Sequence, residues 1–451
     1  MRSRLALLVL LALPLALAAG EPAALLKATA DTGAYDTLKA LTTEIGPRLA
    51  GSPADHRAHA WAAARLRALG LQVRTEEVPL ARTWIRGVSK ATLGTTPLRL
   101  AQHAWSPSTR GPLAAPLALV PARNAFSLQG LDLKGRIVLA GEPTRDLDPP
   151  MMAPPLRLGP AAPESHGFPL TQALPALQKA GVRAVLLDAG KTGDALNMDG
   201  SPLPDQALDL PVAFVAHGDY LRLAAAAEKG ESLDLELGGT FGPAGHTLNT
   251  VAELRGSERP AEAVLLGAHL DSWDLGTGAT DNGAGVAAVM EAARLLTTLG
   301  AKPRRTVRFV LFGGEEQGYL GSAAYAKAHG EELPKLSAVF VMDTGAGAVD
   351  AVALQGRTAV LPVLTPLLEP LKALGVVDTD LRNEGGTDHI PFHRAGVPAF
   401  CLEQRQHSYA RDHHAETDTL DKVDPGELQQ CAVVLAWLGW QVADLPGMLP
   451  R

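Results

Sequence analysis

The stretch from Val264 to Gly285, VLLGAHLDSWDLGTGATDNGAG, limits what this chain can fold into more than any other. It begins with a short apolar run, which is typical of a strand buried in a parallel sheet. His269 and Asp271 follow where that strand should end, and a glycine-rich loop then leads to Asp281. Apolar spacing over Val286–Leu299 predicts a helix. In open α/β sheets, ligands bind beyond the carboxyl ends of the strands, so this stretch delivers an imidazole and two carboxylates to that edge.

The alternation of strands and helices continues along the rest of the chain and predicts an α/β fold. Strands are expected at five places after residue 248: Thr250–Leu254, Val264–Ala268, Val307–Phe312, Ala338–Met342 and Val397–Leu402. Helices fill most of the gaps, which predicts a mostly parallel mixed sheet flanked by helices on both faces. Earlier, residues 22–49 and 58–69 have helical patterns, and residues 71–93 alternate as one or two strands.

Residues 106–245 have a separate strand and helix pattern that contains no cluster of catalytic residue types. The phrases LKGRIVLAG, ALQKAGVRAVLL and LPVAFVAHGDYL carry this pattern and resemble the protease-associated domain found in several exported peptidases. Nine prolines between residues 143 and 175 predict a long loop. We therefore expect a discontinuous main domain, residues 21–105 and 246–451, that carries this protease-associated-like insert.

Composition and the N-terminal sequence limit the classes of protein that remain. The formal net charge of −7 gives no basic patch for nucleic acid. Residues 1–20 have a basic start, an apolar core and a small-residue end, which predict a signal peptide and a secreted or periplasmic protein. A membrane anchor is the alternative, but a span needs about 20 apolar residues, and this run is shorter and contains Pro14. No later segment is apolar enough to span, so we expect no stable membrane span after cleavage.

Two cysteines, Cys401 and Cys431, remain in the exported chain. They could form one disulfide. We favour free thiols, because Cys401 lies in the apolar run VPAFCL.

Acidic residues and histidines also follow other predicted strands. Glu315 and Glu316 lie just past one strand, Asp343 directly follows another, and HHAETDT near the C-terminus supplies His413 and His414. Imidazole and carboxylate groups are the ligands of zinc and similar divalent ions. Each residue alone has a structural explanation, such as a helix N-cap or a solvated loop. Their shared place at strand ends offers more ligands than one tetrahedral zinc needs, and this predicts a two-metal site.

Taken together, these motifs resemble the di-zinc aminopeptidase family, which also contains the glutamate carboxypeptidases. The resemblance rests on HLDSWDLGTGATDNGAG, GGEEQG, the strand-end Asp343 and HHAETDT. HLDSWD followed by GxGAxD is most similar to the plasma glutamate carboxypeptidase branch. EGGTDHIPFHRAGVPAF (residues 384–400) resembles the substrate-side loop and the last core strand of the family. The resemblance covers about residues 30–105 and 246–445 and implies the di-zinc exopeptidase fold.

The resemblance also implies two zinc ions per chain, held by five ligands: His269, Asp281, Glu316, Asp343 and His414. His269 and Asp343 would hold one ion, Glu316 and His414 the other, and Asp281 would bridge them. General chemistry agrees, because one carboxylate can hold two cations about 3.5–4 Å apart.

Two further residues receive roles from the same resemblance. Glu315 would be the general base, and Asp271 would hold His269 from behind, as a metal-bound imidazole normally donates its other N–H to a carboxylate. His414 is preferred to His413 as the ligand because it matches the family spacing to Asp418. His413 either contacts substrate or packs, and both interpretations stay open.

The sequence is therefore interpreted as an exported zinc-dependent exopeptidase for short peptides, using a metal-activated water and Glu315. Resemblance to the glutamate carboxypeptidase branch implies dipeptide substrates, whereas the wider family implies aminopeptidase activity, and both stay open. A homodimer is expected from resemblance only. One alternative is a single-zinc glutaminyl cyclase, against which the retained His269 and Asp343 argue. Another is an inactive peptidase-fold binding protein, against which the complete ligand set and Glu315 argue.

Overall fold

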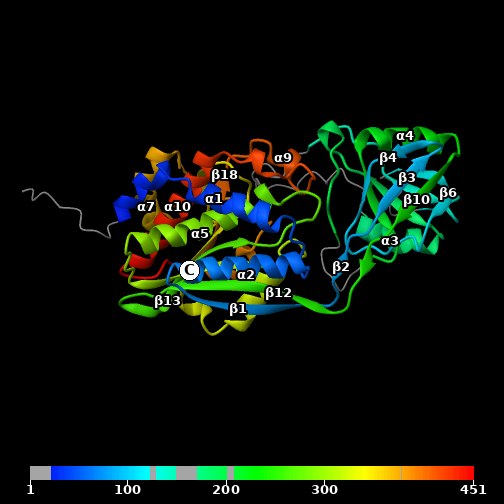
Figure 1. Ribbon diagram of the computed structural model, residues 1–451. Coiled ribbons are helices and arrows are strands. Elements are labelled where there is room, and N and C mark those ends of the chain that lie inside the picture. Colours follow the sequence, from blue (N-terminus) through cyan, green and yellow to red (C-terminus); the bar gives the residue numbers. More distant parts are fainter. Residues whose placement is uncertain (1–21, 122–127, 129, 149–169, 201–207, 377) are drawn as a thin grey trace, which may run out of the picture.

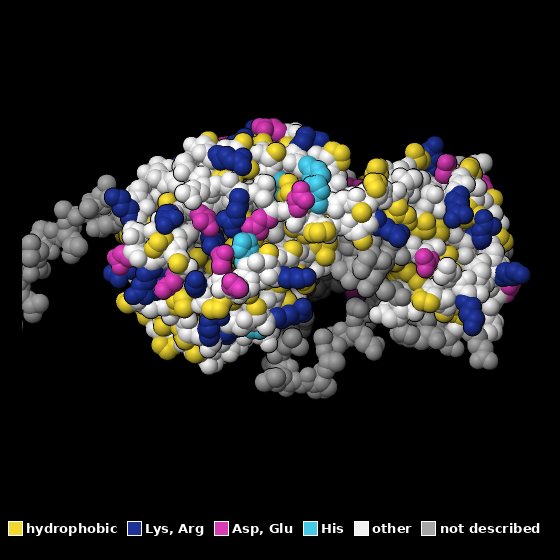
Figure 2. Space-filling view, turned by 90° about the horizontal axis from the view of Figure 1, so that it is seen from below, with side chains coloured by type: hydrophobic (Ala, Val, Ile, Leu, Met, Phe, Trp, Pro, Cys, Tyr) yellow, Lys and Arg dark blue, Asp and Glu magenta, His cyan; other side chains and the backbone are white. Residues whose placement is uncertain are grey.

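The computed structural model describes residues 22–121, 128, 130–148, 170–200, 208–376 and 378–451. The expected signal peptide, residues 1–20, and most of the expected proline-rich loop lie outside these described residues. Two eight-stranded sheets organise the chain into a larger and a smaller lobe (Figure 1). On the face drawn in Figure 2, basic and acidic side chains are interspersed over both lobes. Within the described ranges, no helix is both long and apolar enough to cross a membrane.

The larger lobe is built on a mixed sheet with the strand order β1-β12-β14-β13-β15-β18-β16-β17. The strands of this sheet, in that order, are Gln72–Leu80, Gly245–Leu254, Arg305–Phe312, Arg259–His269, Leu336–Met342, Ala399–Gln404, Val349–Ala353 and Asp378–Asp380. Strands β14, β13, β15 and β18 are parallel neighbours at its centre. Their carboxyl ends therefore lie at one edge, where such sheets place ligands.

The central strands are apolar along their whole length because helices cover both faces of the sheet. Alternate residues of β13 enter different cores: Val264 and Leu266 pack in one, and Leu265 in the other. This is the period of two expected for a strand. The first core also receives side chains from α1 (Gly33–Ala40), α2 (Pro53–Ala68), α5 (Ala284–Thr298) and α10 (Pro425–Asp444).

The predicted α/β class, a mixed sheet between helices, is confirmed, and all five expected strands are present. The sheet is nevertheless more mixed than the pattern suggested, since β1, β12 and β16 form antiparallel pairs. Strands β16 and β17, VDAVA and DTD, were not predicted. They are short and partly acidic, so they lack the apolar run that marked the others.

The smaller lobe contains a second sheet with the order β4-β3-β10-β6-β7-β8-β9-β5. Its strands, in that order, are Thr96–Leu98, Ser89–Leu93, Ser232–Leu237, Leu113–Val120, Ile137–Ala140, Ala184–Asp188, Val212–Val215 and Leu100–Gln102. Helices α3 (Leu170–Lys179) and α4 (His217–Glu228) pack on it. Because α3 begins at Leu170 and contains Pro175, the loop expected to reach residue 175 ends earlier.

This second sheet takes in strands from residues 89–102, ahead of the boundary expected at residue 106. The assignment to a protease-associated-like insert stays a prediction. A short pair, β2 (Trp84–Ile85) with β11 (Thr240–Phe241), lies between the lobes (Figure 1). In the larger lobe, Cys401 and Cys431 are both buried free thiols, as favoured from the sequence.

Candidate metal centre

The sequence-predicted site residues meet at the carboxyl edge of the central strands. His269 is the last residue of β13, and Asp343 directly follows β15. Glu315 and Glu316 lie in the loop after β14, and Asp281 lies in the short turn that leads into α5. These side chains therefore reach the edge from three neighbouring strands, β13, β14 and β15, which explains how residues far apart in sequence come together.

His269 forms the first group with two carboxylates. Its Nε2 atom lies 3.2 Å from Asp281 Oδ1 and 3.2 Å from Asp343 Oδ1. All three side chains are nearly buried, and their ligand atoms are close enough together to hold one metal ion. The predicted pairing of His269 with Asp343 is thus present in the geometry.

His414 forms the second group. Its Nε2 atom lies 3.0 Å from Glu316 Oε2 and 3.5 Å from Asp281 Oδ2. The two oxygens of Asp281 therefore face different histidines, Oδ1 toward His269 and Oδ2 toward His414. A carboxylate that bridges two cations has this arrangement.

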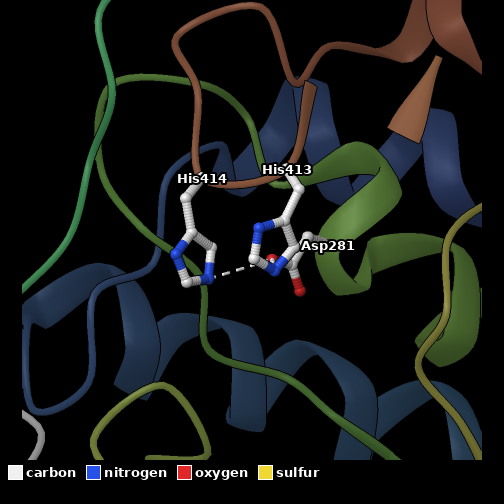
Figure 3. A group of neighbouring side chains, drawn as sticks. All are labelled: Asp281, His413 and His414. Carbon is white, nitrogen blue, oxygen red and sulfur yellow. Dashed lines mark ion pairs between the residues drawn. The ribbon is translucent and has the colours of Figure 1, made fainter. Parts of the chain in front are cut away.

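His413 is also part of this centre. Its Nε2 atom lies 3.5 Å from Asp281 Oδ2, and its ring stacks on His414 with centroids 3.7 Å apart. Figure 3 shows the two imidazoles side by side next to the Asp281 carboxylate, with the ion pair between His414 and Asp281 drawn as a dashed line. Asp281, His413 and His414 thus form a second set that could hold an ion. The contact of Glu316 with His414, at 3.0 Å, is shorter than the contact of either histidine with Asp281 Oδ2, at 3.5 Å. Glu316 therefore remains a candidate ligand, with His413 beside it.

The buried donors fit a metal ion. Glu316 Oε1 is buried and has no hydrogen-bond partner among the described residues. A buried carboxylate oxygen without a partner is costly unless a cation or donor meets it. Two imidazoles and three carboxylates are a ligand chemistry that zinc accepts. The residues present are therefore suited to the ion that the sequence implied.

Without a metal, the protein groups at this centre must share protons among themselves. Burial raises the pKa of Glu316 to about 7, with help from Asp281 and against the effect of His414. Burial alone would lower the pKa of His414, but Glu316 and Asp281 raise it to about 9. Burial would raise the pKa of Asp281, yet contact with His269 and the other histidines holds it well below its usual value. A metal ion that binds here must displace these protons.

Glu315 lies beside both groups. The carboxylates paired closely with the two histidines are those of other residues: Asp281 and Asp343 for His269, and Glu316 for His414. Burial raises the pKa of Glu315 well above its usual value; His269 opposes this, and the nearby Asp343 and Asp388 add to it. A carboxylate whose protonated form is favoured in this way can accept a proton during a reaction. The position and the chemistry both suit a proton shuttle.

Asp271 contacts His269 through its carboxylate, as expected, and also through its backbone. The Nδ1 atom of His269 lies 3.7 Å from the Asp271 carboxylate and 3.1 Å from its backbone carbonyl oxygen. The carboxylate also accepts a hydrogen bond from the backbone N–H of Glu315 at 3.2 Å. Asp271 therefore links the His269 imidazole to the loop that carries Glu315.

Asp418 holds Asp281 in place, a role that the sequence did not reveal. Its Oδ1 atom accepts hydrogen bonds from Thr280 at 2.6 Å (backbone N–H) and 2.8 Å (hydroxyl). Its Oδ2 atom accepts one from the backbone N–H of Asp281 at 3.1 Å. The family spacing marked Asp418, but only the fold shows what its carboxylate contacts.

Arg48 is the second residue that the sequence did not single out. It is fully buried, and its guanidinium donates to the carbonyl oxygens of Leu270, Thr277 and Gly278. These bonds hold both ends of the glycine-rich loop between β13 and Asp281. No periodicity or motif around Arg48 could have shown this, because its partners lie more than 200 residues away.

A small pocket opens on the second group. It is lined by residues of both lobes: Met198, Trp273, Gly278, Asp281, Glu316, His414 and Asp418. The segment resembling the substrate-side loop lies on the other side of the centre, where Thr387 hydrogen-bonds to Asp343. As expected, its last part is a core strand, β18.

The fold and this set of buried imidazoles and carboxylates define an α/β protein with a candidate metal centre at the carboxyl edge of its sheet. Residues 249–438 match the model of Peptidase family M28. A crystal structure of a Peptidase M28 precursor from Shewanella amazonensis is 31% identical and superposes with a TM-score of 0.81, covering 95% of this chain and 97% of that one. The chain therefore belongs to peptidase family M28, and the predicted family is confirmed.

Two further relatives have narrower descriptions. Carboxypeptidase Q from Mus musculus is 29% identical over 426 residues, which cover 92% of this chain and 87% of that protein. The structure of a zinc aminopeptidase from Bacillus subtilis, 21% identical, superposes with a TM-score of 0.68, covering 90% of this chain and 93% of that one. At that identity the second likeness shows the fold alone.

Proposed function

We propose that this chain is an exported zinc-dependent exopeptidase that hydrolyses short peptides and binds two ions, with Asp281 between them. The observation that carries the proposal is the orientation of the Asp281 carboxylate. Its two oxygens face His269 and His414 separately, and each histidine has a further carboxylate partner. Membership of family M28 and the carboxypeptidase relative support peptide hydrolysis.

In this proposal, His269 and Asp343 hold one ion, and Glu316 and His414 hold the other. Bound zinc supplies Lewis acidity toward the scissile carbonyl and brings the pKa of water toward neutrality. Glu315 takes the proton from the attacking water and passes it to the leaving amine. The link from the Asp271 carboxylate to the Glu315 backbone keeps this base beside His269. Asp418 fixes the backbone on which the bridging carboxylate stands.

A small pocket between Trp273, Met198 and the second ligand group opens on the centre, and in this proposal it takes one end of a short peptide. Aminopeptidase and dipeptidase activity both fit, since each requires a free terminus near the centre. Secretion or a periplasmic location rests on the expected signal peptide, and a homodimer rests on resemblance.

Elemental analysis of the purified protein, together with a peptide panel, tests the proposal. The panel contains free dipeptides and longer peptides, each with N-acetylated and C-amidated versions. We expect two zinc ions per chain and cleavage that is abolished when the required terminus is blocked. Cleavage inside doubly blocked peptides would contradict an exopeptidase, and a protein that binds no zinc would contradict the metal centre.

The same experiment separates the two alternatives. A glutaminyl cyclase would bind one zinc and convert peptides with N-terminal glutamine to the cyclised product without hydrolysis. An inactive binding protein would leave every peptide in the panel intact. Asp281→Asn serves as the matched control, because it keeps the shape of the side chain and weakens metal binding.

A further inference from the structure

One segment of the smaller lobe, Lys191–Gly200, lies against the loop of the larger lobe that carries His413 and His414. This loop follows α9 (Tyr409–Asp412), which lies on the side of the larger lobe nearest the smaller one (Figure 1). The sequence analysis found no cluster of catalytic residue types in the smaller lobe. The contacts between the two segments suggest that the smaller lobe has a part in catalysis.

Lys191 makes the most specific of these contacts. Only 6% of the residue is exposed, and its ammonium donates to the carbonyl oxygens of Ala410 at 2.9 Å and His413 at 3.0 Å. Taking a lysine charge out of water is costly unless hydrogen bonds compensate. Here both acceptors belong to the backbone on either side of the turn that leads to His414.

The backbone of the segment pairs with the residues after His414 in the manner of a short strand. The N–H of Met198 donates to the carbonyl oxygen of His414 at 2.6 Å, and Asn197 forms an antiparallel bridge with Ala415. The backbone N–H of Glu416 donates to the carbonyl oxygen of Leu196 at 3.1 Å. In return, the Glu416 carboxylate accepts a hydrogen bond from the backbone N–H of Leu196 at 3.0 Å.

The conformation of His414 explains why such support is needed. Its φ angle is +51°, in the left-handed region that non-glycine residues rarely adopt. Residues in this region keep the conformation only when their surroundings hold it. Two hydrogen bonds from the smaller lobe hold His414 in this conformation. Lys191 donates to the carbonyl oxygen of His413, and the backbone N–H of Met198 donates to that of His414.

The ring of His414 is also supported through Trp273. The two rings meet edge to face with centroids 5.7 Å apart. A Cβ atom at Gly200 would lie 2.5 Å from the Trp273 ring, so glycine allows the segment to close against it. Met198 and Trp273 share one apolar cluster in which residues of both lobes meet.

We propose that the segment Lys191–Gly200 of the smaller lobe completes the metal centre, with Lys191 as a positioning residue for His414. The inference rests on the proposed function, because it assigns to Lys191 an effect on a metal ligand. Lys191 acts through the backbone of the His413–His414 turn and does not touch the ions or the substrate. The half of the centre formed by His269 and Asp343 is held by the strands and does not depend on Lys191.

Metal binding by Lys191→Met tests the proposal. Metal-free, full-length protein is titrated with zinc against a chromophoric chelator, and its thermal unfolding is recorded without metal. We expect the affinity for one of the two ions to fall about 10–100-fold, the usual effect of removing a partner that orients a ligand. The affinity for the other ion and the unfolding temperature of the metal-free protein should stay as in the wild type. A general structural defect would instead lower both affinities together with the unfolding temperature.

Two further variants complete the experiment. Lys191→Arg keeps a buried cation that can donate to the same carbonyls, so it should recover part of the lost affinity. Lys179→Met removes an exposed lysine of the same lobe and should change neither affinity. If the Lys191→Met protein does not fold, Lys191→Gln, which keeps one donor group, is measured in its place with the same expectation.

Two results would overturn the inference. If Lys191→Met binds two ions with wild-type affinities, the inference is wrong and the proposed function stands. If the wild-type protein itself binds fewer than two ions, the proposed function fails and the inference fails with it.

Discussion

The two halves of the metal centre are built in different ways. His269 and Asp343 lie at the ends of adjacent buried strands, and their side chains are 1% and 6% exposed. His414 lies on a loop, its side chain is 22% exposed, and its backbone is held by the smaller lobe. The first half is therefore fixed by the sheet, whereas the second depends on contacts between segments about 220 residues apart. We therefore expect mutations, low pH and changes in the smaller lobe to weaken metal binding at the second half before they weaken it at the first.

Loss of Asp281 should have the largest effect, because it is the one residue that both halves share. Asp281→Ala should remove both ions and lower kcat/KM by about 10⁴-fold or more, since the activated water and the polarised carbonyl are lost together. Elemental analysis after gentle dialysis, combined with peptide hydrolysis, checks this. If one ion were retained at full occupancy, the two halves would be independent and Asp281 would not bridge them.

The adjacent glutamates should separate proton transfer from metal binding. Glu315→Gln should keep both ions and lower turnover by about 10²–10⁴-fold, the usual contribution of a general acid–base group. Glu316→Gln puts a poor neutral ligand in place of a charged one, so it should weaken the second half directly. Added zinc should then partly restore activity to the Glu316 variant only. Loss of metal from the Glu315 variant, with retention by the Glu316 variant, would show that the roles are exchanged.

Metal affinity should fall as the pH falls. Contact with Glu316 raises the pKa of His414 to about 9, so this imidazole is protonated below that pH when no metal is bound. Zinc binds the unprotonated ring, and each displaced proton lowers the apparent affinity by about tenfold per pH unit below the pKa. Competition titrations between pH 9 and 6 measure this slope. An affinity that does not change over this range would contradict the proposed exchange of protons for metal.

Met198→Ala should have the smallest effect and should act on selectivity. The Met198 side chain lines the pocket beside Trp273, and its sulfur accepts a hydrogen bond from the backbone N–H of Leu275 at 2.8 Å. A smaller residue widens the pocket, so the preference for peptides with large side chains over small ones should rise by about tenfold. Ratios of kcat/KM over a dipeptide series check this, with zinc content as the control. Unchanged ratios would show that the smaller lobe does not shape the substrate pocket.

The contrast between the halves also explains what the sequence could and could not predict. Strands β13, β14 and β15 were predictable because each is an apolar run, and the polar residues just after them pointed to the sheet edge. His269, Glu316 and Asp343 could be found in this way. Asp281 was found from the same stretch as His269, whereas the choice of Glu316 over Glu315 and of His414 over His413 needed the family resemblance.

Sequence patterns could not predict the residues that support the centre. Arg48 and Lys191 contact backbone carbonyl oxygens, and any residue type can supply such an acceptor. Their partners are more than 200 residues away, so no local spacing marks them. The Asp271 carboxylate was assigned to His269 from the resemblance, and the structure adds its hydrogen bond from the Glu315 backbone. Such contacts follow from the three-dimensional packing of the loops.

The central claim, two ions held on either side of Asp281, is tested most directly by anomalous X-ray diffraction from zinc-loaded crystals at the zinc edge. We expect two peaks about 3.5–4 Å apart, one beside His269 and Asp343 and the other beside Glu316 and His414. A single peak, or a second peak held by His413 with Glu316 turned away, would contradict the account.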